Sequence, residues 1–344
     1  AGGTRWGAPR LDSGTMRLIL AGTPEPALPV LHALLGSHHE VVAVLTRPDA
    51  PKGRGRTLHP SPVSAAAQEA GVRVLTPRSL RDPDAVAELA RVIADEGVDA
   101  VPVVAYGNLV PPALLDAPRH GWLNLHFSLL PAWRGAAPVQ HAIRAGDTRT
   151  GASVFRLEAG LDTGPVFDTV ERDIAPTDTS GDLLAALADE GAALMLRVLD
   201  GLEAGTAAAT PQPEDGVTLA SKIEVADARV DLTRPAADVD RLIRATTPAP
   251  GAWTTDPAGR RLKLRPVRPL GDDEARDAQS AGSLAPAEVR VERRRVLVGT
   301  GAGIVELGEV APAGKSWMAA DAWARGARLE PGARLGTEQA EGAR

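Results

Sequence analysis

Asn124 and His126 are the two side chains whose type and spacing point most directly to chemistry. They stand two residues apart in an apolar run, and because alternate residues of a strand face the same side, the amide and the imidazole share one face. Polar groups at the end of an apolar strand cost free energy on burial unless something uses them. An amide can donate a hydrogen bond to a developing oxyanion, and an imidazole can transfer a proton. We therefore expect a functional site at this strand end.

A turn closes the strand directly after this pair. The segment Ser128-Leu129-Leu130-Pro131 contains a proline that cannot continue the ladder pairing, so the chain must form a loop. Doubly wound α/β sheets bind their ligands beyond the carboxyl ends of their strands, where this turn would lie.

Asp162 is the third candidate, in the loop Gly160-Leu161-Asp162-Thr163-Gly164. The flanking glycines would let the loop bring its carboxylate close to a ligand or to His126, where it would orient the ring and favour its charged form. Each candidate alone also has a structural alternative: a buried histidine, an amide that caps a turn, or an aspartate that bonds its own backbone. The catalytic interpretation depends on all three meeting in one crevice.

Alternating strand and helix patterns must position these residues. They indicate right-handed crossovers and an α/β fold with a parallel-rich, Rossmann-like sheet. The expected strands cover 17–20, 40–45, 71–75, 99–105, 122–127, 152–157 and 166–174, and the expected helices cover 27–35, 62–70, 84–96, 137–145 and a long segment from the cap at 178–179 to 202. The first strand ends in Gly-Thr-Pro-Glu-Pro at 22–26 without G-x-G-x-x-G spacing, which argues against a nicotinamide-linked oxidoreductase.

The last third of the chain has a different pattern. Residues 205–216 lack periodicity and contain two prolines, which is typical of a linker. Beyond them, several short strand patterns without intervening helices predict a small antiparallel barrel. The predicted domains are an N-terminal extension over 1–15, an α/β domain over 16–204, a linker over 205–221, a barrel domain over 222–336 and a tail over 337–344.

The composition excludes several classes of protein. A chain of 344 residues suits about two domains, and the absence of cysteine excludes disulfides, a thiolate nucleophile and a cysteine-ligated metal. No apolar run reaches the roughly 18 residues of a membrane span, and the segment before Met16 lacks an apolar core of signal-peptide length. The histidines show no metal-ligand spacing. We expect a monomeric cytoplasmic protein with no membrane partner and no metal.

Basic residues are unevenly distributed along this chain of net charge −6. After residue 221 there are 20 basic and 18 acidic residues, which leaves a net charge of −8 for the first 221 residues. Two basic clusters in the C-terminal part suit either a nucleic-acid backbone or charged edge strands that prevent aggregation. The clusters are Arg260, Arg261, Lys263 and Arg265, and Arg293, Arg294 and Arg295.

A long basic loop follows the second predicted strand. Residues 47–56 are too rich in proline and glycine to predict regular structure, and they exceed the usual length of about 2–6 residues for a strand-to-helix loop. Lys52, Arg54 and Arg56 alternate with glycines there. They form either a solvated loop or an arm that contacts phosphates, since guanidinium groups suit phosphate oxygens.

Together these segments resemble the 10-formyltetrahydrofolate-dependent formyltransferases. The shared motifs are Asn124-x-His126, the turn at 128–131, Trp-Arg-Gly-Ala-Ala-Pro at 133–138 and the loop at 160–164, and the resemblance covers about residues 16–336. It implies a catalytic role for Asn124, His126 and Asp162. It also implies 10-formyltetrahydrofolate as co-substrate, lying against Ser128, Leu129, Leu130 and Pro131.

The resemblance also bears on the formyl acceptor. In relatives that formylate an aminoacyl-tRNA, an inserted basic loop at this position enters the acceptor stem, and Arg54 occupies the place of its key arginine, between Lys52 and Arg56. Together with a tRNA-binding C-terminal barrel, this implies transfer to the amino group of methionyl initiator tRNA, for translation initiation. The alternatives are a formyltransferase for a sugar nucleotide or another small amine, and a non-catalytic RNA-binding module, which would be expected to lack an intact trio.

Overall fold

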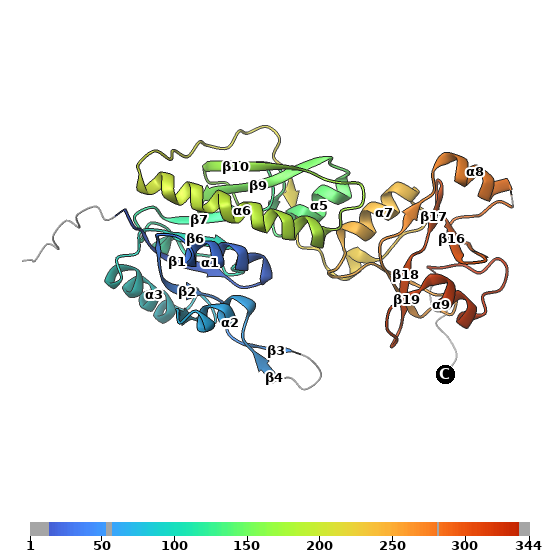
Figure 1. Ribbon diagram of the computed structural model, residues 1–344, viewed down its shortest axis with the longest axis horizontal. Helices are drawn as coiled ribbons and strands as arrows, with labels where there is room; N and C mark the ends of the chain where they lie inside the picture. Colours follow the sequence, from blue (N-terminus) through green and yellow to red (C-terminus); the bar gives the residue numbers. More distant parts are fainter. Residues whose placement is uncertain (1–13, 53–56, 281, 337–344) are drawn as a thin grey trace, which may run out of the picture. The chain divides into compact units, whose positions relative to one another are not determined.

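The computed structural model describes residues 14–52, 57–280 and 282–336 (Figure 1). Within these residues the chain forms two units. Of the described residues, unit 1 contains 14–52, 57–134, 151–171 and 185–218, and unit 2 contains 135–150, 172–184, 219–280 and 282–336. The units interleave along the chain, whereas the predicted domains are consecutive segments whose boundaries remain a prediction.

A seven-stranded sheet, in the order β10-β9-β7-β6-β1-β2-β5, forms the centre of unit 1. Its strands are β1 (Arg17–Gly22), β2 (Glu40–Leu45), β5 (Arg73–Leu75), β6 (Val101–Val104), β7 (Trp122–His126), β9 (Arg149–Arg156) and β10 (Val166–Asp173). The pairings from β7 through β6, β1 and β2 to β5 are all parallel, and β7 pairs with β9 in antiparallel fashion. The prediction of a parallel-rich, Rossmann-like sheet is confirmed.

Two of the helices that accompany this sheet, those that begin at Pro62 and Ser180, are preceded by residues whose side chains satisfy free backbone N–H groups. Ser61 Oγ accepts from Ser64 N at 3.0 Å, and Thr179 Oγ1 accepts from Asp182 N at 3.2 Å while the Asp182 carboxylate accepts from Thr179 N at 3.1 Å. The elements are η1 (Glu25–Ala27), α1 (Leu28–Leu35), α2 (Pro62–Glu69), α3 (Pro83–Asp95), α4 (Pro112–Leu115), α5 (Pro138–Ala145) and α6 (Ser180–Glu203). No helix in the described residues is both long and apolar enough to cross a membrane.

Strand β7 is held in the core by its apolar residues. Trp122 and Leu123 are fully buried, and the Trp122 indole N–H donates to Leu114 O at 2.7 Å. Helix α6 approaches the strand closely at Gly191, where a Cβ would lie 2.6 Å from Leu125 Cδ2. Leu123 and Leu125 are therefore fixed by packing on one face of β7, and Asn124 and His126 share the other face with the buried Trp122.

The proline- and glycine-rich segment after β2 contains more regular structure than expected. Strand β3 (Ala50–Lys52) pairs with β4 (Thr57–His59) in an antiparallel ribbon, so the expectation of an irregular loop was wrong for these residues. Each strand of a two-stranded ribbon has one side without ladder bonds, so a proline such as Pro51 is tolerated there.

The C-terminal part of unit 2 contains two antiparallel sheets, in the orders β12-β13-β18-β19 and β14-β17-β16-β15. They confirm the prediction of a small barrel-like domain, although helices α8 and α9 were not foreseen. Strands β8 (Arg134–Gly135) and β11 (Leu219–Ala220) form a separate two-stranded sheet. The elements after β11 are η2 (Ala226–Ala228), α7 (Ala236–Ala245), β12 (Trp253–Thr255), β13 (Arg261–Leu264), β14 (Arg268–Pro269), α8 (Asp272–Ser280), β15 (Val289–Glu292), β16 (Arg295–Gly299), β17 (Ile304–Glu306), β18 (Glu309–Pro312), β19 (Met318–Ala319) and α9 (Ala320–Ala327).

Candidate active site

The side chains of Asn124 and His126 differ in burial although they share a face of β7. His126 is 5% exposed, whereas Asn124 is half-buried. Among the residues that the structure describes, the Asn124 side-chain amide makes no hydrogen bond. Its N–H groups are therefore available to a ligand, which is what an oxyanion donor requires.

One hydrogen bond determines the tautomer of His126. Its Nε2 lies 2.8 Å from the carbonyl oxygen of Trp133, which can only accept, so Nε2 carries the hydrogen. In the neutral ring Nδ1 is then an unprotonated acceptor. His126 can take a proton at Nδ1 without losing its hydrogen bond to Trp133.

The loop at 160–164 brings Asp162 to this free nitrogen. Asp162 Oδ2 lies 3.8 Å from His126 Nδ1, within the range of an ion pair but beyond a hydrogen bond. The left-handed conformation falls on Asp162 itself, with φ of 52°, and aspartate tolerates this region better than most residues. The glycines serve close approach instead: a Cβ on Gly164 would lie 1.8 Å from Arg156 O, and one on Gly160 would lie 2.3 Å from Thr163 Oγ1.

Burial controls the charge state of this histidine. Burial lowers the pKa of His126 below its usual value of 6.5, although the Asp162 carboxylate and the Trp133 carbonyl act to raise it. The ring is therefore neutral near pH 7 and is a proton acceptor, with a carboxylate placed to stabilise the imidazolium once it forms.

The turn at 128–131 is fixed by hydrogen bonds to the chain. Ser128 is fully buried and donates through Oγ to Ala132 O at 2.6 Å, and Ser153 Oγ donates to Ser128 O at 2.7 Å. Leu129 and Leu130 are half-buried. The turn therefore offers backbone and apolar surface to a ligand, and its contact with folate remains a prediction.

Polar residues at the end of β6 were not identified from the sequence. Because β6 and β7 are parallel, their carboxyl ends meet at one edge of the sheet. Tyr106, the only tyrosine of the chain, is 2% exposed there, and burial raises its pKa. Asn108 Nδ2 is buried without a hydrogen-bond partner in the described chain. The sequence feature that could have identified Tyr106 and Asn108 is their position directly after a predicted buried strand.

The segment predicted as a linker also contributes to the site. Thr218 accepts from Trp133 N through Oγ1 at 2.8 Å and from Arg134 N through its carbonyl at 2.9 Å. Gln212 bonds to the loop that carries Asp162. Composition alone could not reveal these contacts, because they depend on side chains within an aperiodic segment.

The three predicted tRNA-contacting residues are differently placed. Lys52 ends strand β3 of the two-stranded ribbon. Arg54 and Arg56 lie outside the described residues. Their role remains a prediction.

A histidine cluster lies at the opposite edge of the sheet, near the amino ends of β1 and β2. Ligand atoms of His38, His39 and Glu203 all lie within 4.8 Å of one another, although no metal spacing was noted in the sequence. However, Met16 N donates to His39 Nδ1 at 3.3 Å, so the Nε2 of the neutral ring carries its hydrogen toward Asp200, 3.1 Å away. That ring has no lone pair to offer a metal ion, and the donor set is better suited to hydrogen bonding.

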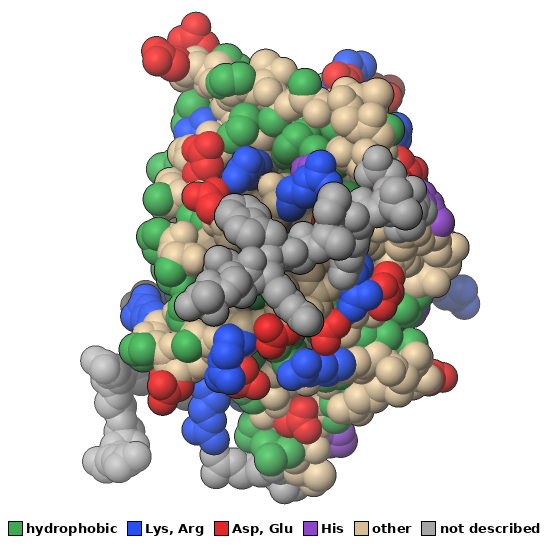
Figure 2. Space-filling model, turned by 90° about the vertical axis from the view of Figure 1, so that its left-hand side faces the viewer, with side chains coloured by type: hydrophobic (Ala, Val, Ile, Leu, Met, Phe, Trp, Pro, Cys, Tyr) green, Lys and Arg blue, Asp and Glu red, His purple; other side chains and the backbone are tan. Residues whose placement is uncertain are grey.

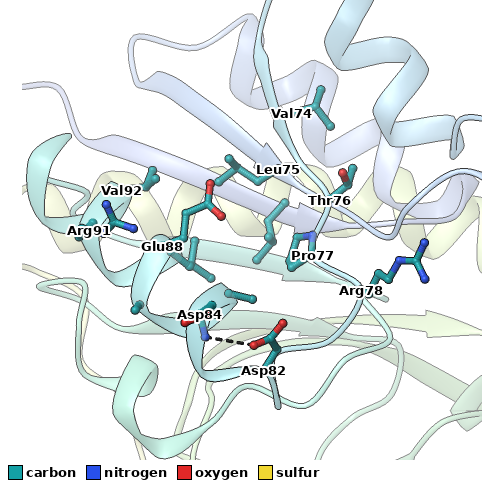
Figure 3. A pocket seen from close by; sticks show the side chains of 14 residues that line it. Val74, Leu75, Thr76, Pro77, Arg78, Asp82, Asp84, Glu88, Arg91 and Val92 are labelled. Atoms are coloured by element: carbon teal, nitrogen blue, oxygen red, sulfur yellow. Dashed lines mark hydrogen bonds between the residues drawn. The ribbon is translucent and has the colours of Figure 1, made fainter.

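A cavity of about 660 Å³ between β5 and α3 is distinct from the candidate site (Figure 3). Its walls combine apolar residues with charges of both signs, including Arg78, Arg91, Asp82 and Glu88. Neither the trio nor the turn at 128–131 lines it. This cavity is therefore not the candidate active site, although it is large.

Comparisons with known proteins identify similar sequences over most of the chain. The family described as Formyl transferase matches residues 16–199, and Formyl transferase, C-terminal domain, matches residues 222–328. A methionyl-tRNA formyltransferase from Acidothermus cellulolyticus is 59% identical over 93% of this chain and 100% of its own length. One from Salinispora arenicola is 58% identical over 92% of this chain and 99% of its own.

Solved structures share the fold at low sequence identity. The N-formyltransferase from Helicobacter canadensis, in complex with folinic acid and dTDP-3-aminofucose, has a TM-score of 0.60 and 15% identity, over 85% of this chain and 98% of that one. A variant of HypX from Aquifex aeolicus has a TM-score of 0.60 and 19% identity, over 91% of this chain and 47% of that one. These similarities concern the fold alone.

Proposed function

Because the chain belongs to the formyl transferase family, we propose that it transfers the formyl group of 10-formyltetrahydrofolate to the free amino group of methionyl-tRNA. The observation that carries this proposal is the 59% identity to a methionyl-tRNA formyltransferase over that relative's whole length. The sugar-nucleotide alternative has less support, since the solved structures whose names point to sugar N-formyl transfer are 13% to 24% identical to this chain.

The candidate site fits a formyl donor. The Asn124 amide makes no hydrogen bond in the described chain, and the neighbouring turn at 128–131 offers backbone and half-buried leucines. Bound 10-formyltetrahydrofolate supplies the electrophilic formyl carbon and a nitrogen leaving group. Asn124 donates a hydrogen bond to the formyl oxygen, and this bond strengthens as negative charge builds on that oxygen.

His126 accepts the proton of the attacking amine and returns it to the leaving group. As the amine nitrogen forms its bond to the formyl carbon, Nδ1 of the neutral ring accepts the proton that the amine must lose. Asp162, 3.8 Å away, stabilises the resulting imidazolium. The ring then returns the proton to the nitrogen whose bond to the formyl carbon breaks, so the site ends in its starting state.

This assignment predicts the pH dependence of the rate. Because burial lowers the pKa of His126, the ring stays neutral to a lower pH than a free imidazole, and kcat should fall only as pH decreases through a midpoint below 6.5. Single-turnover formyl transfer measured between about pH 5 and 8 checks this expectation. Because protonation of the acceptor amine also lowers the rate, the limb that belongs to His126 is the one that disappears in a His126→Asn variant. If that limb is centred at or above 6.5, a neutral His126 as the proton acceptor is contradicted.

Unit 2 offers a surface with the chemistry for a tRNA backbone. On β13, Arg261 and Lys263 are exposed while Leu262 is buried, so the basic residues share one face. The Arg261 guanidinium lies 4.0 Å from the Trp253 ring centroid. Since β13 lies between β12 and β18, edge protection does not explain these charges.

Arg265 lies just beyond this strand; its guanidinium lies 4.7 Å from the Trp317 ring centroid and also forms an ion pair with Glu309. Guanidinium groups stacked on aromatic rings suit phosphates and bases together. By contrast, acidic and basic side chains are mixed on the face of the molecule shown in Figure 2. A tRNA partner is supported by this local arrangement and not by the net charge of −6.

The proposal assigns a tRNA contact to Arg54. Replacing Arg54 by Ala should lower kcat/KM for methionyl-tRNA by about 10- to 10²-fold, the loss expected for a hydrogen bond to a charged group, and leave folate affinity unchanged. The matched control is Arg81→Ala, which removes an exposed arginine elsewhere in unit 1. Equal tRNA kinetics for the two variants would contradict the role assigned to Arg54.

The full proposal is a monomeric cytoplasmic enzyme that acts on the initiator tRNA in translation initiation. The test of the reaction is to incubate the purified chain with 10-formyltetrahydrofolate and methionyl-tRNA and to quantify both products. We expect equal yields of tetrahydrofolate and N-formylmethionine. Tetrahydrofolate without N-formylmethionine would identify a hydrolase and contradict the transfer.

A further inference from the structure

Gln212 uses its whole side-chain amide to join two segments of the active site. Its Nε2 donates to Asp162 O at 2.7 Å and to Gly164 O at 2.8 Å. Its Oε1 accepts from Arg134 Nε at 3.0 Å and Nη2 at 2.7 Å. All four hydrogen-bonding positions are used, and the guanidinium, which only donates, fixes which way the amide points.

The backbone on either side of Gln212 is anchored as well. Before it, Thr210 and Val166 exchange two backbone hydrogen bonds of 2.8 Å. After it, Thr218 accepts from Trp133 N at 2.8 Å. Trp133 is also the residue whose carbonyl fixes the His126 tautomer. One segment, residues 210–218, therefore supports both members of the His126–Asp162 pair.

We propose that Gln212 is a positioning residue that holds Asp162 against His126, an inference that rests on the proposed catalytic roles of that pair. Asp162 adopts a left-handed conformation, with φ of 52°, which aspartate tolerates better than most residues but which is still held by contacts of its loop. Gln212 supplies such a contact at the carbonyl of Asp162 itself. The Asp162–His126 contact of 3.8 Å is electrostatic, so its strength depends directly on where the loop is held.

The test is Gln212→Met, which keeps an unbranched side chain but removes both donors and the acceptor. With the loop released, the carboxylate no longer raises the pKa of His126, so the pKa should fall further below 6.5, and kcat should fall by about 10- to 10²-fold with the folate KM unchanged. The pKa is measured by NMR titration of labelled histidine, with the His126 signal assigned from a His126→Asn variant. This readout does not require activity.

Two further variants keep the test decisive. Gln68→Met, on the exposed face of α2, is the matched control and should leave the pKa of His126 and kcat unchanged. Arg134→Met removes the group that orients Gln212 while keeping its donors, and should shift the pKa in the same direction by a smaller amount. It serves as the test if Gln212→Met does not fold.

The outcomes separate the inference from the proposed function. An unchanged pKa of His126 and unchanged kcat in the Gln212 variant, beside a slow Asp162→Asn variant, would overturn the role of Gln212 and leave Asp162 in place. Wild-type kcat in Asp162→Asn would remove the role of Asp162 and this inference with it. A lower melting temperature with an unchanged pKa of His126 would show that Gln212 only stabilises the fold.

Discussion

Replacing His126 by Asn is expected to lower kcat for formyl transfer by about 10²- to 10⁴-fold, the range for loss of a general acid–base group. The reason is specific to Nδ1, which faces Asp162 and is unprotonated because Nε2 is committed to the Trp133 carbonyl. Asparagine keeps a polar side chain in a position that is 5% exposed but cannot accept the amine proton. Single-turnover kinetics with saturating co-substrate measure the effect.

The matched control for this variant is His32→Asn, on the exposed side of α1. It should keep wild-type kcat. Folate affinity should survive in both variants, because the turn at 128–131 is held by Ser128 and Ser153 and not by His126. A His126→Asn enzyme that keeps near wild-type kcat would show that the proton leaves by another route.

The second large effect is expected for Asn124→Ala. Its kcat should fall by about 10²- to 10³-fold, the loss typical of one oxyanion donor. The Asn124 amide makes no hydrogen bond in the described chain, so its removal should leave no polar group of the protein unpaired. The melting temperature and folate affinity should therefore change little while the chemical step slows.

Asn124→Asp sharpens the same experiment. It preserves the size of the side chain but places a carboxylate where negative charge develops, so it should be at least as slow as Asn124→Ala. Loss of folate affinity with an unchanged kcat in either variant would show that Asn124 only binds the ground state. It would contradict the role of Asn124 as a donor to the oxyanion.

Much of the fold was predictable because its signals are local. The apolar runs at 17–20, 40–45 and 122–127 correspond to β1, β2 and β7, and the helical spacing after Thr179 corresponds to α6. Period-2 alternation placed Asn124 and His126 on one face of their strand, since the buried Leu123 and Leu125 take the other. These local patterns reflect which residues become buried, and burial of the apolar residues determines where these strands and this helix form.

Other features depend on contacts between distant residues. Gln212 meets Asp162 across 50 positions and Arg134 across 78, in a segment whose composition is typical of a linker. The tautomer of His126 depends on a carbonyl that the turn brings back to the ring. The ribbon of β3 and β4 forms although its residues have low strand propensity. No local pattern carries such information.

The most direct test of the central claim is a competition for one formyl donor. The purified chain is given 10-formyltetrahydrofolate with methionyl initiator tRNA, methionyl elongator tRNA and a 4-amino sugar nucleotide, and kcat/KM is measured for each acceptor. We expect the initiator to be formylated in preference to both of the others. Formylation of the sugar nucleotide without formylation of either tRNA would leave the folate chemistry in place. It would contradict the assigned acceptor and the tRNA-binding roles proposed for both basic regions.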